Sequence, residues 1–360
     1  MSALKFFRKG VPVNPLEVFK EGKYFDEQRA KRLHVNLVID ALADDDIIGD
    51  TRMLLVPQTN NAIVKTRVLV EDEREMAPQG ATFTVIVLGE EILEPSAAQR
   101  AHALKKLIDR MERHKQPCAI VTKSEKVVSL AALLDTSVQN IISVESYEAL
   151  AAKLALWCAE NMPEERLALA ANFEFVRHSV ALEFVKATAL QNGVVGGVAF
   201  IPGADMPIMT LNQIKMVLQI AAAYGEPMNM ARVKELATVV AGAFVSRTIA
   251  RELVAFIPGV GWAIKAGIGY GATYAMGLAV VEYFSMGGND ISFGDFIKGA
   301  KDDIIDKAHD IAEKHMSEDE ATTKPQRRAG TAHSVAHFAH SSAKEVKRLY
   351  IESKGTRDNA

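Results

Sequence analysis

The pattern of apolar and polar residues changes near Pro163. Before this proline, short apolar runs alternate with segments of helical spacing, and polar residues or Gly and Pro bound each run. Short, bounded runs of this kind are typical of buried β-strands. The sequence predicts strands at residues 35–39, 53–56, 63–70, 83–88, 118–121 and 140–144.

Two segments of the same region have the apolar spacing of amphipathic helices. Residues 96–114 lie between predicted strands, and residues 147–160 follow the last one. Strands separated by helices predict a mostly parallel sheet with helices on its faces. We therefore expect an N-terminal arm at 1–32 and a three-layer α/β domain of a degenerate Rossmann or G-domain-like type at 33–162.

Beyond Pro163 the chain becomes apolar and poor in charge. Residues 164–186 still carry charges at helical spacing, but residues 187–204 and 266–281 carry none. Such runs are near the short limit of what crosses a bilayer core of about 30 Å. We expect an all-α hydrophobic helical domain at 163–288, so that the whole chain is an α+β multidomain protein.

The sequence Val-Ala-Phe-Ile-Pro-Gly occurs twice, at residues 198–203 and at 254–259. Proline removes a backbone donor and glycine supplies unusual dihedral angles, so each copy predicts a helix that stops, turns and restarts. In the first copy, Asp205 is placed to cap the restarting helix. The residues that define the two hairpins are Phe200, Pro202, Gly203 and Asp205 in the first copy and Phe256, Pro258 and Gly259 in the second.

Two further features describe how these helices pack. Asn212, Lys215 and Gln219 form a polar stripe after the first hairpin. The stripe is either a solvent-facing edge, which we favour slightly, or a hydrogen-bonded seam between helices. Gly267 and Gly271, spaced four apart in an apolar run, form a small-residue face that lets helix backbones approach closely.

The C-terminal part divides by charge. Residues 289–320 are expected to form an acidic helix, in which 301–320 hold eight acidic and three basic residues, a net charge of −5. Residues 321–360 hold eight basic and three acidic residues, a net charge of +5, and several histidines. Their composition predicts a mobile tail. The acidic and histidine runs are more typical of solvated faces than of ligands, so we expect no metal site.

The composition narrows the function classes. The net charge of −3 gives no general attraction to nucleic acid, so no nucleic-acid partner is expected. The two cysteines, Cys118 and Cys158, lie in apolar surroundings without metal-ligand spacing and are interpreted as reduced core residues. No Ser-His-Asp or Cys-His arrangement is apparent, so no catalytic residue is assigned and no cofactor is expected.

Nucleotide binding is the main chemistry that an α/β domain suggests. The chain has no G-x-x-x-x-G-K-[ST] loop, and the first predicted strand is followed by the acidic loop 40–46, which would repel a phosphate. Thr122, Lys123 and Glu125 follow a strand where guanine-binding domains have [NT]-K-x-D, and they are weak candidates for nucleotide contact. The sequence favours a catalytically silent scaffold.

The central block of about 187–288 resembles the YcjF-like, GTPase-associated membrane domain family, whose role is unsettled. The resemblance rests on FIPGADMPIMTLNQIKMVLQIAAAYG and AFIPGVGWAIKAGIGYGATYAMGLAVVEYF, with their two Pro-Gly breaks. It implies a bacterial protein on the cytoplasmic face of the inner membrane, peripheral or integral. It also implies membrane lipid and a GTPase as partners, and the Gly-rich helices suggest a homo-oligomer.

The resulting hypothesis is a membrane-associated scaffold or interaction protein. One alternative is a GTPase-like nucleotide-binding enzyme with an unconventional phosphate site. A second alternative is a small membrane pore or transport module, which requires Asn212, Lys215 and Lys265 to face a common interior.

Overall fold

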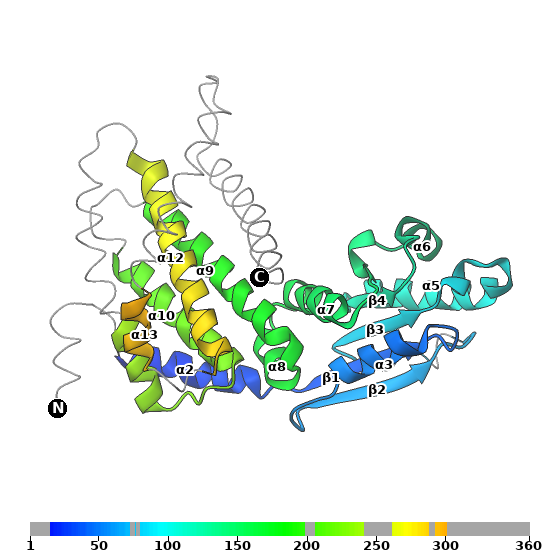
Figure 1. Ribbon diagram of the computed structural model, residues 1–360, viewed down its shortest axis with the longest axis horizontal. Coiled ribbons are helices and arrows are strands. Elements are labelled where there is room, and N and C mark those ends of the chain that lie inside the picture. The colour runs from blue at the N-terminus through cyan, green and yellow to red at the C-terminus, as the bar shows by residue number, and fades with distance from the viewer. Residues whose placement is uncertain are drawn as a thin grey trace, which may run out of the picture. The chain divides into compact units, whose positions relative to one another are not determined.

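The computed structural model describes residues 15–72, 76, 80–198, 206–240, 261–287 and 292–300 (Figure 1). The chain divides into two compact units. We call Lys23–Glu183 with Ala221–Pro227 the sheet unit, and the described residues of Met1–Gly22, Phe184–Ile220 and Met228–Ala360 the helical unit.

The sheet unit contains a five-stranded sheet in the order β2-β1-β3-β4-β5. Every pair of neighbouring strands is parallel. This is one of the two common strand orders of doubly wound α/β folds, and it confirms the predicted parallel sheet with flanking helices. The strands are β1 (Leu33–Ile39), β2 (Ala62–Val68), β3 (Phe83–Leu88), β4 (Cys118–Thr122) and β5 (Ile141–Ser143).

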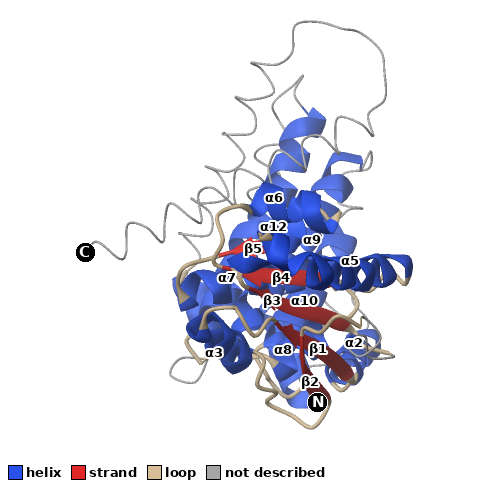
Figure 2. Cartoon of the chain, turned by 90° about the vertical axis from the view of Figure 1, so that its right-hand side faces the viewer, coloured by secondary structure: helices blue, strands red, loops and turns tan. Residues whose placement is uncertain are grey.

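Helices cover both faces of the sheet (Figure 2). On one face, α5 (Ala98–Arg113) and α6 (Val127–Leu134) pack on alternate strand residues such as Ile86 and Ile120 in one apolar cluster. The opposite face carries α3 (Asp45–Leu54) and α7 (Tyr147–Asn161), which touch each other. All residues of β3 and β4 are buried because both of their faces are covered, as in other doubly wound sheets.

The strand predicted at 53–56 is wrong. Met53 and Leu54 are the last residues of α3, and Leu55 is its C-cap. Leu54 and Leu55 are buried, whereas Met53 and Val56 are more than half exposed. A short apolar run at a helix end has the same pattern as a short strand, so periodicity alone did not separate the two.

The helical segment predicted at 164–186 is interrupted. It consists of α8 (Arg166–Asn172), a 3-10 turn at Glu174–Val176 and α9 (Arg177–Val198). Phe173 is extended between them, with φ −130° and ψ 110°. The backbone carbonyl of Asn172 accepts a hydrogen bond from Gln58 N at 2.8 Å, so tertiary contacts occupy the groups freed by the break.

In the helical unit, α9 and α12 (Gly261–Ser285) pack at very short range. A Cβ on Gly277 would lie 2.5 Å from Cγ1 of Val185, and a Cβ on Gly269 would lie 2.7 Å from the carbonyl oxygen of Asn192. The glycines at this contact, Gly269 and Gly277, lie two positions before and six positions after the predicted Gly271. The other helices that contribute to this unit are α2 (Pro15–Arg29), α10 (Met206–Ala223), a helical stretch at 230–240 and α13 (Phe293–Gly299).

Several predicted features lie outside the described residues. They include the acidic segment 301–320 and the tail 321–360. The hairpin residues Phe200, Pro202, Gly203, Asp205, Phe256, Pro258 and Gly259 lie outside them as well. Among the helices that are described, none has both the length and the apolar character required to cross a membrane.

Candidate functional site

Doubly wound sheets bind ligands outside the carboxyl ends of the strands, where the chain leaves neighbouring strands toward opposite faces. Here this switch point lies between β1, which leads to α3 on one face, and β3, which leads to α5 on the other. Asp40 follows β1 and Gly89 follows β3. These two residues mark where a ligand-binding crevice is expected.

The loop after β1 closes this position. A Cβ on Gly89 would lie 2.7 Å from the carbonyl oxygen of Leu42, so the two backbones are in direct contact. The loop is held by its own turn, in which Ala43 N donates to Asp40 O at 3.0 Å and Leu42 N donates to Asp40 Oδ1 at 3.2 Å. A carbonyl oxygen, rather than a backbone N–H, therefore faces the turn after β3.

An ion pair joins the first residue of the loop to α5. Arg100, in α5, donates from Nη1 to Oδ1 of Asp40 at 2.9 Å. The Asp40 side chain is 1% exposed, and its other oxygen, Oδ2, has no hydrogen-bond partner. A buried carboxylate oxygen without a donor is costly, so this atom is a place where an incoming donor would be stabilised.

The weak nucleotide-contact candidates do not act together. Lys123 donates to Asp46 and lies 4.0 Å from Asp44, and this hydrogen bond raises the pKa of Lys123 and lowers that of Asp46. Thr122 is buried, and its hydroxyl accepts a hydrogen bond from Ser124 N at 3.1 Å. Glu125 is exposed. Of the three candidates, only Lys123 reaches the loop after β1.

The carboxyl ends of the strands are strongly acidic. Each of the five loops that leave a strand has at least one exposed carboxylate, and the basic side chains among the described residues of these loops are Lys123 and Lys126. Lys126 pairs with Glu90 at 2.5 Å, which raises the pKa of Lys126. We call the following nine exposed residues the acidic edge: Asp44, Asp45, Asp46, Glu71, Asp72, Glu90, Glu91, Glu125 and Glu145.

Sequence reasoning singled out the part of the acidic edge that follows β1, and Glu125 after β4. The other carboxylates are scattered from Glu71 to Glu145, and the sheet topology brings them to one edge of the sheet. The available signal was an acidic residue within a few positions of each predicted strand end. The opposite ends of the strands differ, because Lys31 and Arg32 precede β1 and Lys115 precedes β4.

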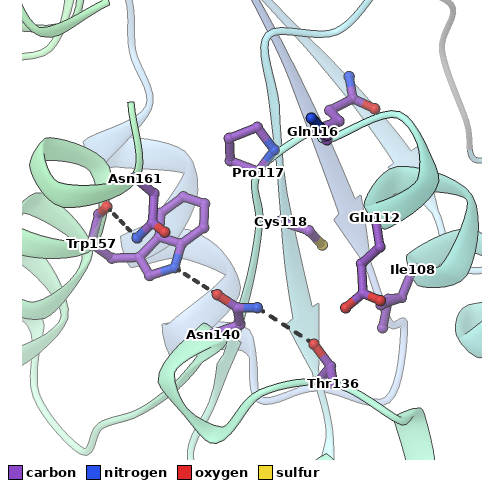
Figure 3. Close-up of a pocket in the computed structure, with 10 residues that line it drawn as sticks. Ile108, Glu112, Gln116, Pro117, Cys118, Thr136, Asn140, Trp157 and Asn161 are labelled. Atoms are coloured by element: carbon purple, nitrogen blue, oxygen red, sulfur yellow. Dashed lines mark hydrogen bonds between the residues drawn. The ribbon is translucent and has the colours of Figure 1, made fainter. Parts of the chain in front are cut away.

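A small pocket lies at the amino end of β4, lined from α5, α7 and the turn before β5 (Figure 3). Its volume is about 250 Å³. Trp157 Nε1 donates to Asn140 Oδ1 at 3.2 Å and so forms one wall. Burial, together with the charge of Glu112, raises the pKa of Cys118 to about 12. A protonated thiol is a poor nucleophile, so Cys118 provides no activated group here.

Buried polar side chains join three helices of the helical unit. Asn192 in α9 donates to Thr273 Oγ1 in α12 at 3.0 Å, and its own Oδ1 accepts from Asn212 Nδ2 in α10 at 2.9 Å. Gln213 Nε2 also donates to Thr273 Oγ1 at 3.0 Å. We call Asn192, Asn212, Gln213 and Thr273 the amide seam.

The amide seam corrects the interpretation of the polar stripe. The preference for a solvent-facing edge is wrong for Asn212, which bonds across to α9. Lys215 has a different partner, Glu21 in α2, at 2.6 Å. Gln219 is partly exposed. Within the described side chains, Asn212 and Lys215 therefore serve separate contacts.

The described residues contain no group of three or more His, Cys, Asp or Glu side chains arranged to hold a metal ion. A scan against protein-family models and searches of curated proteins and of solved structures find no match to this chain.

Proposed function

We propose that this chain is a scaffold or interaction protein whose sheet unit carries out no chemistry and whose helical unit attaches it to the cytoplasmic face of the inner membrane. The observation that supports a silent sheet unit is the closed switch point, where the carbonyl of Leu42 meets Gly89. In an active doubly wound enzyme this position is an open crevice for the ligand.

The charges at the start of α3 also support a sheet unit that carries out no chemistry. Phosphate binding at the start of a helix requires free backbone N–H groups and a positive electrostatic potential. The first turn of α3 carries Asp45 and Asp46, and its N-cap residue is Asp44. These carboxylates oppose an anion, and the nearest ammonium, on Lys123, is already bonded to Asp46. A degenerate G-domain-like sheet that has lost nucleotide binding fits these features.

Membrane attachment is proposed for the apolar hairpin segments. The charge-free runs and the resemblance to GTPase-associated membrane domains support it. α9 packs on α12 at short range through glycines. Close association of helices depends on such small residues, both in lipid and within a packed bundle. Self-association through these helices and a GTPase partner belong to the same proposal.

Cell fractionation tests the proposal. The full chain is expected to stay with membranes through a high-salt wash, because apolar contact is not screened by salt. A Phe200→Asp/Phe256→Asp variant is expected to move to the soluble fraction. The matched control is Val128→Asp, because Val128 is an apolar residue of the sheet unit that is 74% exposed.

Two results would contradict the proposal. Full recovery of the unmodified chain in the soluble fraction would contradict the proposed membrane attachment. Retention of labelled GTP or ATP by the purified full chain would favour the alternative, a nucleotide-binding enzyme with an unconventional phosphate site.

A further inference from the structure

We infer that the pocket at the amino end of β4 binds a small zwitterionic amine, a molecule of amino-acid size with an N–H-rich cation and a carboxylate. The inference goes beyond the proposed function and does not depend on membrane attachment. All ten residues drawn at this pocket belong to the sheet unit. The pocket lies at the opposite ends of the strands from the closed switch point, so it is a separate site.

The shape and size of the pocket limit the ligand. Trp157 and Asn161, both in α7, form one side, and Glu112 in α5 faces them from the other (Figure 3). Pro117 and Cys118, where β4 begins, lie between these two sides. Pockets for drug-sized ligands have volumes of about 300–1,000 Å³. At about 250 Å³, this pocket is suited to a smaller molecule that packs against an aromatic wall.

Two amides of the pocket leave their oxygens available as acceptors. Asn161 Nδ2 donates to Trp157 O at 2.9 Å, and Gln116 Nε2 donates to Ala81 O. A backbone carbonyl only accepts, so these bonds fix which end of each amide is the oxygen. Asn161 Oδ1 and Gln116 Oε1 have no donor among the described residues. A ligand rich in N–H donors would supply one to each of them.

Two opposite charges line the pocket. Burial and, in addition, the charge of Glu112 raise the pKa of the Cys118 thiol, so this carboxylate lies close to the interior of the pocket. Lys115 follows α5 in a left-handed turn, with φ 52° and its N–H bonded to Glu112 O at 2.9 Å, which fixes its backbone beside Glu112. Among the ion pairs of the described residues, none joins these two side chains. A zwitterionic amine supplies a cation for Glu112 and a carboxylate for Lys115.

Tryptophan fluorescence of the full chain tests this inference. The chain has two tryptophans, so Trp262→Phe leaves Trp157, which forms a wall of the pocket, as the reporter. L-Arginine and L-lysine are the probes, and each is expected to change the Trp157 emission in a saturable way. For ligands of this size the Kd should be at or below about 1 mM.

Three variants separate the pocket from general effects of charge. Glu112→Gln should weaken binding by about tenfold or more, because hydrogen bonds to charged groups are the strongest ones. Glu27→Gln, in α2, removes an exposed carboxylate of the same unit outside the pocket and should leave the affinity unchanged. Lys115→Asn removes the positive charge while keeping a residue that tolerates the left-handed turn, and it should weaken L-arginine binding by about threefold. Agmatine, which is arginine without its carboxylate, should lose no affinity in Lys115→Asn.

Three outcomes would overturn the inference. The first is the absence of a saturable change with either amino acid up to about 10 mM, well above the expected Kd. The second is an affinity of Glu112→Gln that is no lower than that of Glu27→Gln. The third is tighter binding of agmatine than of L-arginine, which would assign the pocket to a cation without a carboxylate.

Discussion

Buried polar side chains find their partners in different ways in the two units. In the sheet unit several bond to nearby backbone, as where Thr51 Oγ1 donates to Ile47 O and Asn172 Nδ2 donates to Ala168 O, each within its own helix. Others there reach further, as Asp40 does to Arg100. In the helical unit, Asn192 and Thr273 bond to each other although they are 81 positions apart. Local bonds accompany a fold that the apolar pattern already specifies, whereas distant bonds fix which helices meet and in what register.

The position of the cysteines allows the stability of each unit to be measured separately. Both cysteines of the chain, Cys118 and Cys158, are buried in the sheet unit. Burial raises the pKa of both thiols, so they react slowly until the sheet unit opens. Thiol labelling therefore reports on the sheet unit, and amide hydrogen exchange in α12 reports on the helical unit.

The largest effect on stability is expected from Gly277→Leu. The new Cβ would overlap Val185, a fully buried residue whose β-branched side chain is restricted in its rotamers. Overpacking of this kind should destabilise the helical unit by about 3 kcal/mol. Hydrogen exchange in α12 should then become roughly a hundredfold faster, while thiol labelling of the sheet unit stays nearly unchanged.

The matched control is Gly49→Ala in α3. No atom lies within 4 Å of the position that the new Cβ would take. Replacing a glycine inside a helix by alanine at an open site should stabilise the protein by about 0.5–1 kcal/mol, so thiol labelling should become slower. An unchanged exchange rate in α12 of Gly277→Leu would mean that the short contact with Val185 is not part of the native packing.

A smaller effect is expected from removing one member of the amide seam. Asn192→Leu removes the acceptor of the partly buried Asn212 and one of the two described donors to the buried Thr273, which should cost about 2 kcal/mol in the helical unit. Thr51→Val in the sheet unit removes only a bond to a backbone carbonyl of its own helix and should cost less than about 1 kcal/mol.

A double-mutant cycle distinguishes this explanation from simple loss of packing. If Asn192 and Asn212 act as a pair, the cost of Asn192→Leu should be partly relieved in Asn192→Leu/Asn212→Leu, because the Asn212 amide that lost its acceptor is then absent. Fully additive costs in urea denaturation would show that the seam contributes no pairwise energy.

The same contrast explains how much the sequence could predict. The strands at β1, β3, β4 and β5 follow from local apolar runs, and Ser146 begins α7 as a cap whose side chain accepts from Ala149 N. The acidic edge and the amide seam depend on which distant segments meet, and no local pattern encodes that. Gln213 is an example: in the sequence it is one polar residue beside Asn212, and only the packing of α12 against α10 gives it a partner.

The smallest effect is expected at the exposed pair of Asp46 and Lys123. Because this hydrogen bond lowers the pKa of Asp46, its contribution to stability is present above the carboxyl's ordinary pKa and is lost as the pH falls through the lowered value. Both side chains are in contact with water, so the ion pair gains little over hydration. Asp46→Asn should therefore leave thiol labelling at pH 7 unchanged within error, in contrast to Asn192→Leu in the other unit. A clear acceleration would mean that the stability of the sheet unit depends on this exposed pair.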